Sequence, residues 1–226
     1  CNRWKVPVWI TSLGARVEVN EAAHECGGIT LHDIIDDRFA RKAIEKGADG
    51  LIAVAAGAGG HAGTWSPFAL IQEIRAWFDG PLLLSGSIAT GDAILAAQAM
   101  GADLAYLGSA FIATEEANAV DAYKQMIVGS GAADIVYSNL FTGIHGNYLR
   151  GSIEAQGMDP TALPQSDPNA MNFSSGSSKP KSWKEIWGAG QGVGAVHGVA
   201  PASEVVARLT REYEAARARL LTGDKT

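Results

Sequence analysis

Residues 48–63 read ADGLIAVAAGAGGHAG, and this stretch decides the fold class. Its first half contains Leu51–Ala55, five apolar residues in a row, which is typical of a strand buried on both faces. Its second half, Gly57–Gly63, holds four glycines and His61 within seven residues. The stretch therefore predicts one strand of a parallel sheet, followed by a loop at the carboxyl end of that strand.

Four more short apolar runs lie around this strand, and helical patterns separate them. We expect strands at residues 6–10, 28–34, 81–85 and 104–107, and helices at residues 17–26, 36–46, 66–78 and 91–100. Asp36 or Asp37 and Ser66 are the expected helix caps. A strand and a helix recurring about every 20 to 30 residues favour a (β/α)8 TIM-type barrel or a doubly wound sheet, both of class α/β.

The regular alternation ends after Phe111. We expect helices at 118–128 and 202–221, a mixed segment at 133–141, and a long loop rich in Pro, Ser, Asn and Gly at 160–182. The sequence therefore predicts two regions: 1–115 with the βα units, and 116–226 with helices and loops packing on them.

Composition excludes several classes of function. A net charge of −6 argues against nucleic acid as a partner, because phosphate binding needs basic patches. The two cysteines, Cys1 and Cys26, cannot build a disulfide framework, and the sequence has no long apolar run and no metal-ligand spacing. We therefore expect a cytoplasmic protein without a membrane or metal partner; assembly into a homo-oligomer stays open.

His61 is the first candidate for chemistry. It lies among glycines that let the backbone approach a ligand closely, at the end of a strand that forms the active-site face in βα barrels. The alternative interpretation is a flexible loop with an incidental histidine.

Two later turns are candidates for a phosphate site. Ser85–Gly86 and Gly108–Ser109 are small residues directly after consecutive strands, where they expose backbone N–H groups. In barrels the loops after the seventh and eighth strands often bind phosphate, whereas the alternative is two ordinary tight turns.

His32 and Asp33 interrupt a strand that is otherwise apolar. Burying polar side chains costs free energy unless they have partners, so both are candidates for a substrate pocket. A satisfied buried pair is an equally good interpretation.

Three segments together resemble one known family. Residues 48–63, 81–91 and 101–114 match, in order and spacing, the nitronate monooxygenases, also called 2-nitropropane dioxygenases, and the likeness runs from about Val6 to Gly143. The likeness is expected to resume at Gly190–Gly194 and in the final helix. The resemblance implies an FMN-binding barrel in which His61 faces the flavin. It also implies the cofactor-binding residues Gly59, Gly60, Ser85, Gly86, Gly108 and Ser109.

The sequence departs from the family in two respects. Many members carry a glutamine and a glutamate where this chain has Val54 and Gly57. The family barrel also has about three strands before the one expected at Val6. We therefore expect that the N-terminal part is missing, and that the visible strands are the fourth to eighth of the barrel, with a C-terminal helical extension.

The resemblance implies oxidation of alkyl nitronates or nitroalkanes by dioxygen to a carbonyl compound and nitrite. The FMN carries the redox chemistry, and His61 stabilises the anionic substrate or acts as a base. Two alternatives remain: an FMN-dependent enoyl-acyl-carrier-protein reductase, and an inactive fragment that binds a phosphate ligand.

Overall fold

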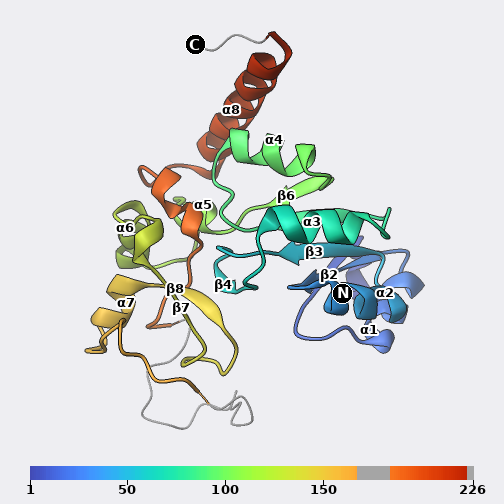
Figure 1. Ribbon diagram of the computed structural model, residues 1–226, viewed down its shortest axis with the longest axis horizontal. Coiled ribbons are helices and arrows are strands. Elements are labelled where there is room, and N and C mark those ends of the chain that lie inside the picture. The colour runs from blue at the N-terminus through green and yellow to red at the C-terminus, as the bar shows by residue number, and fades with distance from the viewer. Residues whose placement is uncertain (167–183, 223–226) are drawn as a thin grey trace. The chain divides into compact units, whose positions relative to one another are not determined.

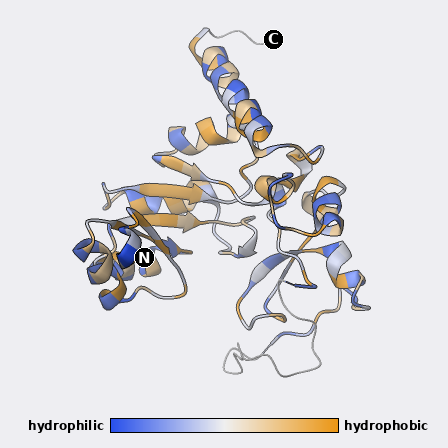
Figure 2. Cartoon of the chain, turned by 180° about the vertical axis from the view of Figure 1, so that it is seen from behind, coloured by the Kyte–Doolittle hydropathy of each residue, from blue (hydrophilic) through white to orange (hydrophobic). Residues whose placement is uncertain are grey.

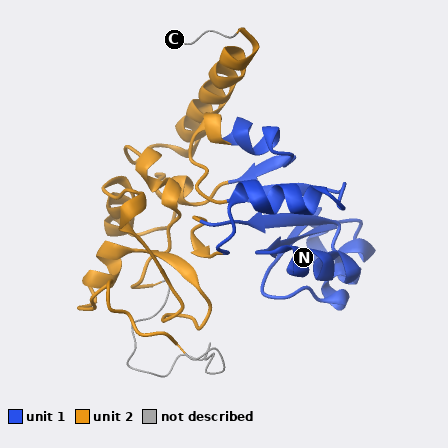
Figure 3. Cartoon of the chain, in the orientation of Figure 1, with its two compact units in different colours: residues 1–56, 63–85, 94–106 blue, residues 57–62, 86–93, 107–226 orange. Residues whose placement is uncertain are grey.

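The computed structural model describes residues 1–166 and 184–222 (Figure 1). These residues form two compact units, coloured separately in Figure 3. Unit 1 comprises 1–56, 63–85 and 94–106, and unit 2 comprises 57–62, 86–93 and the described residues from 107 onward. The boundary near residue 115 stays a prediction about domains. The two compact units divide the chain at other positions and do not test it.

A sheet of parallel strands is the centre of unit 1. Its strands are β1 (Val8–Thr11), β2 (Ile29–Ile34), β3 (Gly50–Val54), β5 (Leu82–Ser85) and β6 (Leu104–Tyr106), in the order β1-β2-β3-β5-β6. Neighbours in the sheet are also successive in the parallel series, which is the arrangement of strands in a βα barrel. Within the described residues the sheet does not close, so the predicted α/β class with an open run of barrel strands is confirmed.

Helices follow these strands as the sequence predicted. They are α1 (Val17–Glu25), α2 (Asp37–Glu45), α3 (Pro67–Arg75) and α4 (Gly91–Ala99), preceded by the short 3-10 helix η1 (Asn2–Trp4). Asp36 caps α2, because its carboxylate accepts a 2.8 Å hydrogen bond from Phe39 N–H. Ser66 is the N-cap residue of α3, as predicted, but its side chain makes no capping hydrogen bond.

The core of unit 1 lies around β3, which is buried along its whole length. Leu51 and Ile52 have no exposed surface, and the strands of this sheet are mostly hydrophobic in Figure 2. By contrast, Ile10 in β1 is 51% exposed and Leu104 in β6 is 57% exposed, because each belongs to an edge strand with a neighbour on one side only.

Unit 2 contains a second, smaller sheet that the sequence analysis did not predict. Its strands β4 (Gly60–His61), β8 (Gly146–Leu149) and β7 (Ile135–Ser138) pair antiparallel in the order β4-β8-β7. The segment at 133–141, interpreted as mixed, thus contains the strand β7.

Helices complete unit 2. They are α5 (Ser109–Ile112), α6 (Asp121–Val128), α7 (Arg150–Glu154) and α8 (Ala202–Thr222), with the 3-10 helices η2 (Ala132–Asp134) and η4 (Gln191–Ala195). Ile127, Leu149 and Val193 are buried in one of its apolar clusters. Most of the loop expected at 160–182 lies outside the described residues. Every helix among those described is too short or too polar to cross a lipid bilayer.

Candidate functional site

All three loops singled out from the sequence start where the chain passes from unit 1 into unit 2. They follow the carboxyl ends of β3, β5 and β6, which lie side by side at one edge of the parallel sheet. Of the predicted phosphate residues, Ser85 ends β5 in unit 1, whereas Gly86, Gly108 and Ser109 belong to unit 2.

Inside unit 2 the glycine loop packs against a segment far along the chain. Gly57 O accepts a 2.8 Å hydrogen bond from Gln191 N–H. A Cβ on Gly59 would lie 2.7 Å from Gly190 N, so only glycine permits this approach. Gly190 N–H in turn donates to Ser109 Oγ at 2.9 Å. The loops after β3 and β6 are therefore joined through residues 190 and 191.

The turn after β5 lies beside the glycine loop and Gln191 as well. A Cβ on Gly57 would overlap Ser87 Oγ and lie 2.8 Å from Gln191 Oε1. Gly57 also has a φ of +83°, which side-chain-bearing residues rarely adopt. Both facts favour glycine at this position, because a larger side chain would displace Ser87 and Gln191.

Gly108 presents open space at the same cluster. It is exposed, and a Cβ built on it would meet nothing within 4 Å among the described residues. Gly59 is exposed as well, while Ser87 has a φ of +56°, an uncommon conformation for a serine. The cluster thus offers accessible backbone at several small residues, which is what a phosphate or a flat ring requires.

His61 is held by the small antiparallel sheet. It is half-buried and pairs with Gly146 of β8, and its Nε2 lies 2.9 Å from Thr142 Oγ1. Burial lowers the pKa of His61 below its usual value, which favours a neutral imidazole.

Two further residues hold the loop, and the sequence analysis missed both. The buried Asn147 Nδ2 donates to Ala58 O at 2.7 Å, and the Tyr137 hydroxyl donates to Ala62 O at 2.9 Å. Asn147 lies in β8, whose four residues are all buried, and a buried amide needs hydrogen-bond partners, but the strand itself was not predicted from the sequence.

His32 and Asp33 do not form a pair. Adjacent strand residues point to opposite faces, and their partners differ accordingly. His32 is 4% exposed and its Nδ1 lies 2.6 Å from Thr11 Oγ1, whereas the partner of Asp33 is Ser12. Burial raises the pKa of Asp33, and its Oδ1 has no hydrogen-bond partner within the described residues. Both remain pocket candidates, but not as one unit.

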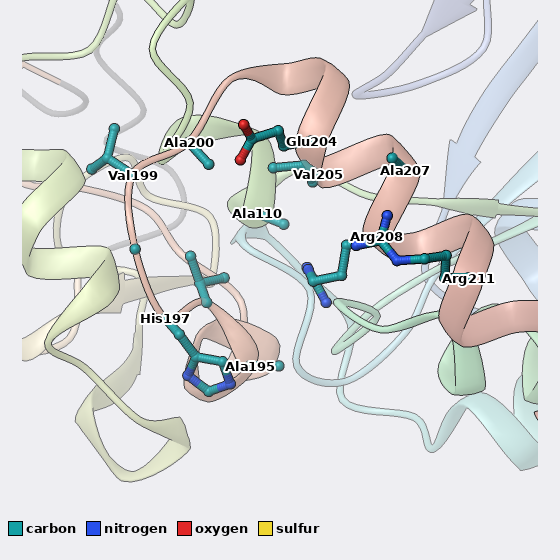
Figure 4. Close-up of a pocket in the computed structure, with 12 residues that line it drawn as sticks. Ala110, Ala195, His197, Val199, Ala200, Glu204, Val205, Ala207, Arg208 and Arg211 are labelled. Carbon is teal, nitrogen blue, oxygen red and sulfur yellow. The ribbon is translucent and has the colours of Figure 1, made fainter. Parts of the chain in front are cut away.

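A cavity of about 480 Å³ lies elsewhere in unit 2 (Figure 4). Ala110, the segment 195–200 and the first turns of α8 line it, and none of the predicted site residues does. Arg208 on its wall is already bound to Glu212 and Ala89 O. The cavity therefore lies next to the turn at Ser109, but His61 is not one of the residues that line it.

Nearly the whole chain matches one known family. The family model for nitronate monooxygenase matches residues 1–212. The chain belongs to the nitronate monooxygenase family. The resemblance inferred from the three loop segments is thus confirmed, and the matched range also includes the further stretch expected at Gly190–Gly194.

Individual relatives agree with the family. A nitronate monooxygenase of Paraburkholderia phytofirmans is 29% identical over 184 residues, which are 74% of this chain and 50% of that protein. A protein of Staphylococcus haemolyticus described as a probable nitronate monooxygenase is 25% identical over 207 residues, covering 82% of this chain and 57% of the relative. The chain spans about half the length of the curated relatives it matches.

Solved structures share the fold. Nitroalkane oxidase from Streptomyces ansochromogenes superposes with a TM-score of 0.78 and 29% identity, over 95% of this chain and 66% of the oxidase. FabK from Thermotoga maritima gives a TM-score of 0.78 at 22% identity, over 99% of this chain and 73% of FabK, which supports the fold alone.

Proposed function

We propose that this chain forms the His61-bearing part of an FMN-dependent enzyme that oxidises alkyl nitronates or nitroalkanes. Dioxygen is the oxidant, and the products are a carbonyl compound and nitrite. The observation that carries the proposal is the convergence of the glycine loop, the turn after β5 and the turn after β6 in unit 2, with His61 held beside them. Family membership and the similarity to nitroalkane oxidase support the same chemistry.

The residues present fit the flavin. At Gly108 the space that a side chain would occupy is open, and the exposed backbone of Gly59 can approach a flat ring. Ser109 Oγ accepts from Gly190 N–H and keeps its own proton to donate to a phosphate oxygen. Gly86 and Ser85 would complete the phosphate contacts, and Gly60 would lie along the ring. The bound FMN supplies the electron transfer to dioxygen.

His61 would serve the substrate. A neutral imidazole can accept a proton from a nitroalkane, and an imidazolium can stabilise a nitronate anion. The burial that lowers the pKa of His61 favours the neutral form, and therefore the role of base. Asp33, whose pKa is raised by burial and whose Oδ1 has no hydrogen-bond partner among the described residues, stays a substrate-pocket candidate within unit 1.

The first test removes the imidazole. The His61→Ala variant of the protein loaded with FMN should release nitrite from nitroalkane far more slowly than the wild type, by roughly 100-fold or more, as expected for loss of a general base. Flavin absorbance after gel filtration should not change. Nitrite release at the wild-type rate would contradict the assignment of His61.

The second test concerns the phosphate turn. The Gly108→Val variant should fold normally, because no atom blocks its side chain, yet it should lose retention of FMN. Gly198→Val is a matched control, since a Cβ there also meets nothing within 4 Å. Equal FMN affinity in both variants would exclude a phosphate at Gly108.

The same preparation tests the alternatives. Bleaching of the bound flavin by NADH without nitroalkane would favour an enoyl-acyl-carrier-protein reductase. A colourless protein that takes up no added FMN would favour an inactive phosphate-binding fragment.

A further inference from the structure

Ser87 is fixed between two glycines of unit 2. A Cβ on Gly57 would overlap Ser87 Oγ, and a Cβ on Gly192 would lie 2.9 Å from Ser87 O, so both glycines pack directly on this serine. The φ of Ser87 is +56°, an uncommon value for a residue with a side chain, and such a conformation persists only where the surroundings hold it. The packing therefore fixes the place of the Ser87 side chain.

Gln191 is anchored through its backbone, which leaves its side chain available. Its N–H donates to Gly57 O at 2.8 Å, and its Oε1 would lie 2.8 Å from a Cβ on Gly57. The carboxamide of Gln191 and the hydroxyl of Ser87 thus lie next to the same glycine. Both residues are exposed, and neither side chain makes a hydrogen bond with another described residue.

The two side chains flank the residues proposed to bind the phosphate of FMN. Ser87 directly follows Gly86, and Gln191 directly follows Gly190, whose N–H donates to Ser109 Oγ at 2.9 Å. The turns after β5 and β6 and residues 190–192 contain no lysine or arginine, so the side-chain donors that they offer a phosphate are neutral. A hydroxyl supplies one proton, and a carboxamide supplies two whichever way the amide is turned.

We propose that Ser87 Oγ and the Gln191 amide donate hydrogen bonds to the phosphate of FMN, in addition to the small residues named above. The inference rests on the proposed function, because it requires FMN as the bound cofactor. Phosphate oxygens are charged acceptors, and a hydrogen bond to a charged acceptor is stronger than one between neutral groups. The two side chains then recognise the phosphate monoester, which riboflavin lacks.

A comparison of FMN with riboflavin tests this recognition, because riboflavin carries the same ring and ribityl chain without the phosphate. Quenching of flavin fluorescence measures the affinity of the full chain for each. We expect Ser87→Gly to weaken FMN binding by about 10- to 100-fold, the range for loss of one hydrogen bond to a charged group, and to change riboflavin binding little. Glycine adopts a φ of +56° readily, so this variant keeps the local backbone.

A change of charge at Gln191 sharpens the test. Gln191→Glu keeps the size of the side chain, removes its two donors and places a carboxylate beside the phosphate. The affinity for FMN should therefore fall further than in Ser87→Gly, whereas the affinity for riboflavin should change little. Gln156→Glu, the same substitution at an exposed glutamine of unit 2, is the control and should bind both flavins as the wild type does. Retained riboflavin binding also shows that each variant is folded.

The outcomes separate this inference from the proposed function. Equal losses of affinity for FMN and riboflavin, or the wild-type affinity for FMN in either variant, would overturn the contact with the phosphate. A wild type that binds neither flavin would overturn the inference and the flavin assignment together. A wild type with the expected pattern of flavin binding that releases no nitrite from nitroalkane would contradict the proposed function alone.

Discussion

Two histidine–threonine pairs in this protein differ in how they arise. Thr11 and His32 are register neighbours on β1 and β2, and their contact follows directly from the pairing of two adjacent strands. Thr142 and His61 are 81 residues apart and meet only because β4 pairs with β8. The first pair is enclosed by unit 1, with His32 only 4% exposed, whereas His61 is half-buried in unit 2.

The comparison distinguishes a histidine buried within a sheet from one that is accessible for chemistry. In unit 1, His32 has its partner Thr11 on the neighbouring strand and is almost completely buried. In unit 2 several short segments join through hydrogen bonds to backbone atoms, which leaves glycine backbone and an imidazole accessible. We therefore expect unit 1 to depend mainly on apolar packing and the glycine loop to depend mainly on individual hydrogen bonds.

The largest effect should come from the core of unit 1. Ile52 is fully buried in β3, so Ile52→Ala should lower the free energy of unfolding by about 2–5 kcal/mol, through lost burial and the cavity left behind. Urea denaturation followed by circular dichroism measures this loss. Leu221→Ala, at a side chain 79% exposed, is the control and should change the free energy little. Similar losses in the two variants would show that packing around β3 does not dominate unit 1.

A smaller and more local effect should follow from loosening the glycine loop. Asn147→Ala removes the donor to Ala58 O and leaves that carbonyl without its partner, which should cost about 1–3 kcal/mol. Hydrogen exchange should accelerate at residues 57–62 while β3 stays protected. Asn118→Ala, at an exposed asparagine, should leave exchange unchanged. Faster exchange in β3 as well would mean that the loop and the strand do not differ in the way proposed.

The smallest effect concerns Asp33 and depends on pH. Because burial raises its pKa in the folded state, the folded protein keeps a proton that the unfolded chain loses above the ordinary value of 3.8. Stability should therefore fall as pH rises from 3.8 through the raised pKa, and Asp33→Asn should not have this loss. Melting temperatures across this range should coincide at the acid end and favour Asp33→Asn at neutral pH. A difference that is the same at every pH would indicate that the carboxyl is not the cause.

The sequence by itself determined the parallel sheet and most of its helices. Apolar runs such as Leu51–Ala55 have few alternatives to a strand buried on both faces, and Asp36 caps a helix through a contact three residues away. The place of the glycine loop followed from the same local patterns, because the carboxyl ends of parallel strands share one edge. Local sequence was therefore sufficient to select His61 and Gly108 as candidates, whereas Gly59 was implied by the family resemblance.

Only the tertiary structure decided what surrounds His61. Thr142, Asn147 and Gln191 lie 80 or more residues from the loop they hold, and no local pattern encodes a pairing across such a separation. His32 and Asp33 point to opposite faces because they are adjacent in a strand, but their partners, Thr11 and Ser12, depended on which neighbours the folded chain supplies. Local chemistry selects strands and turns, whereas hydrogen bonds between distant segments exist only after the chain has folded, and here they set the environment of the candidate catalytic residue.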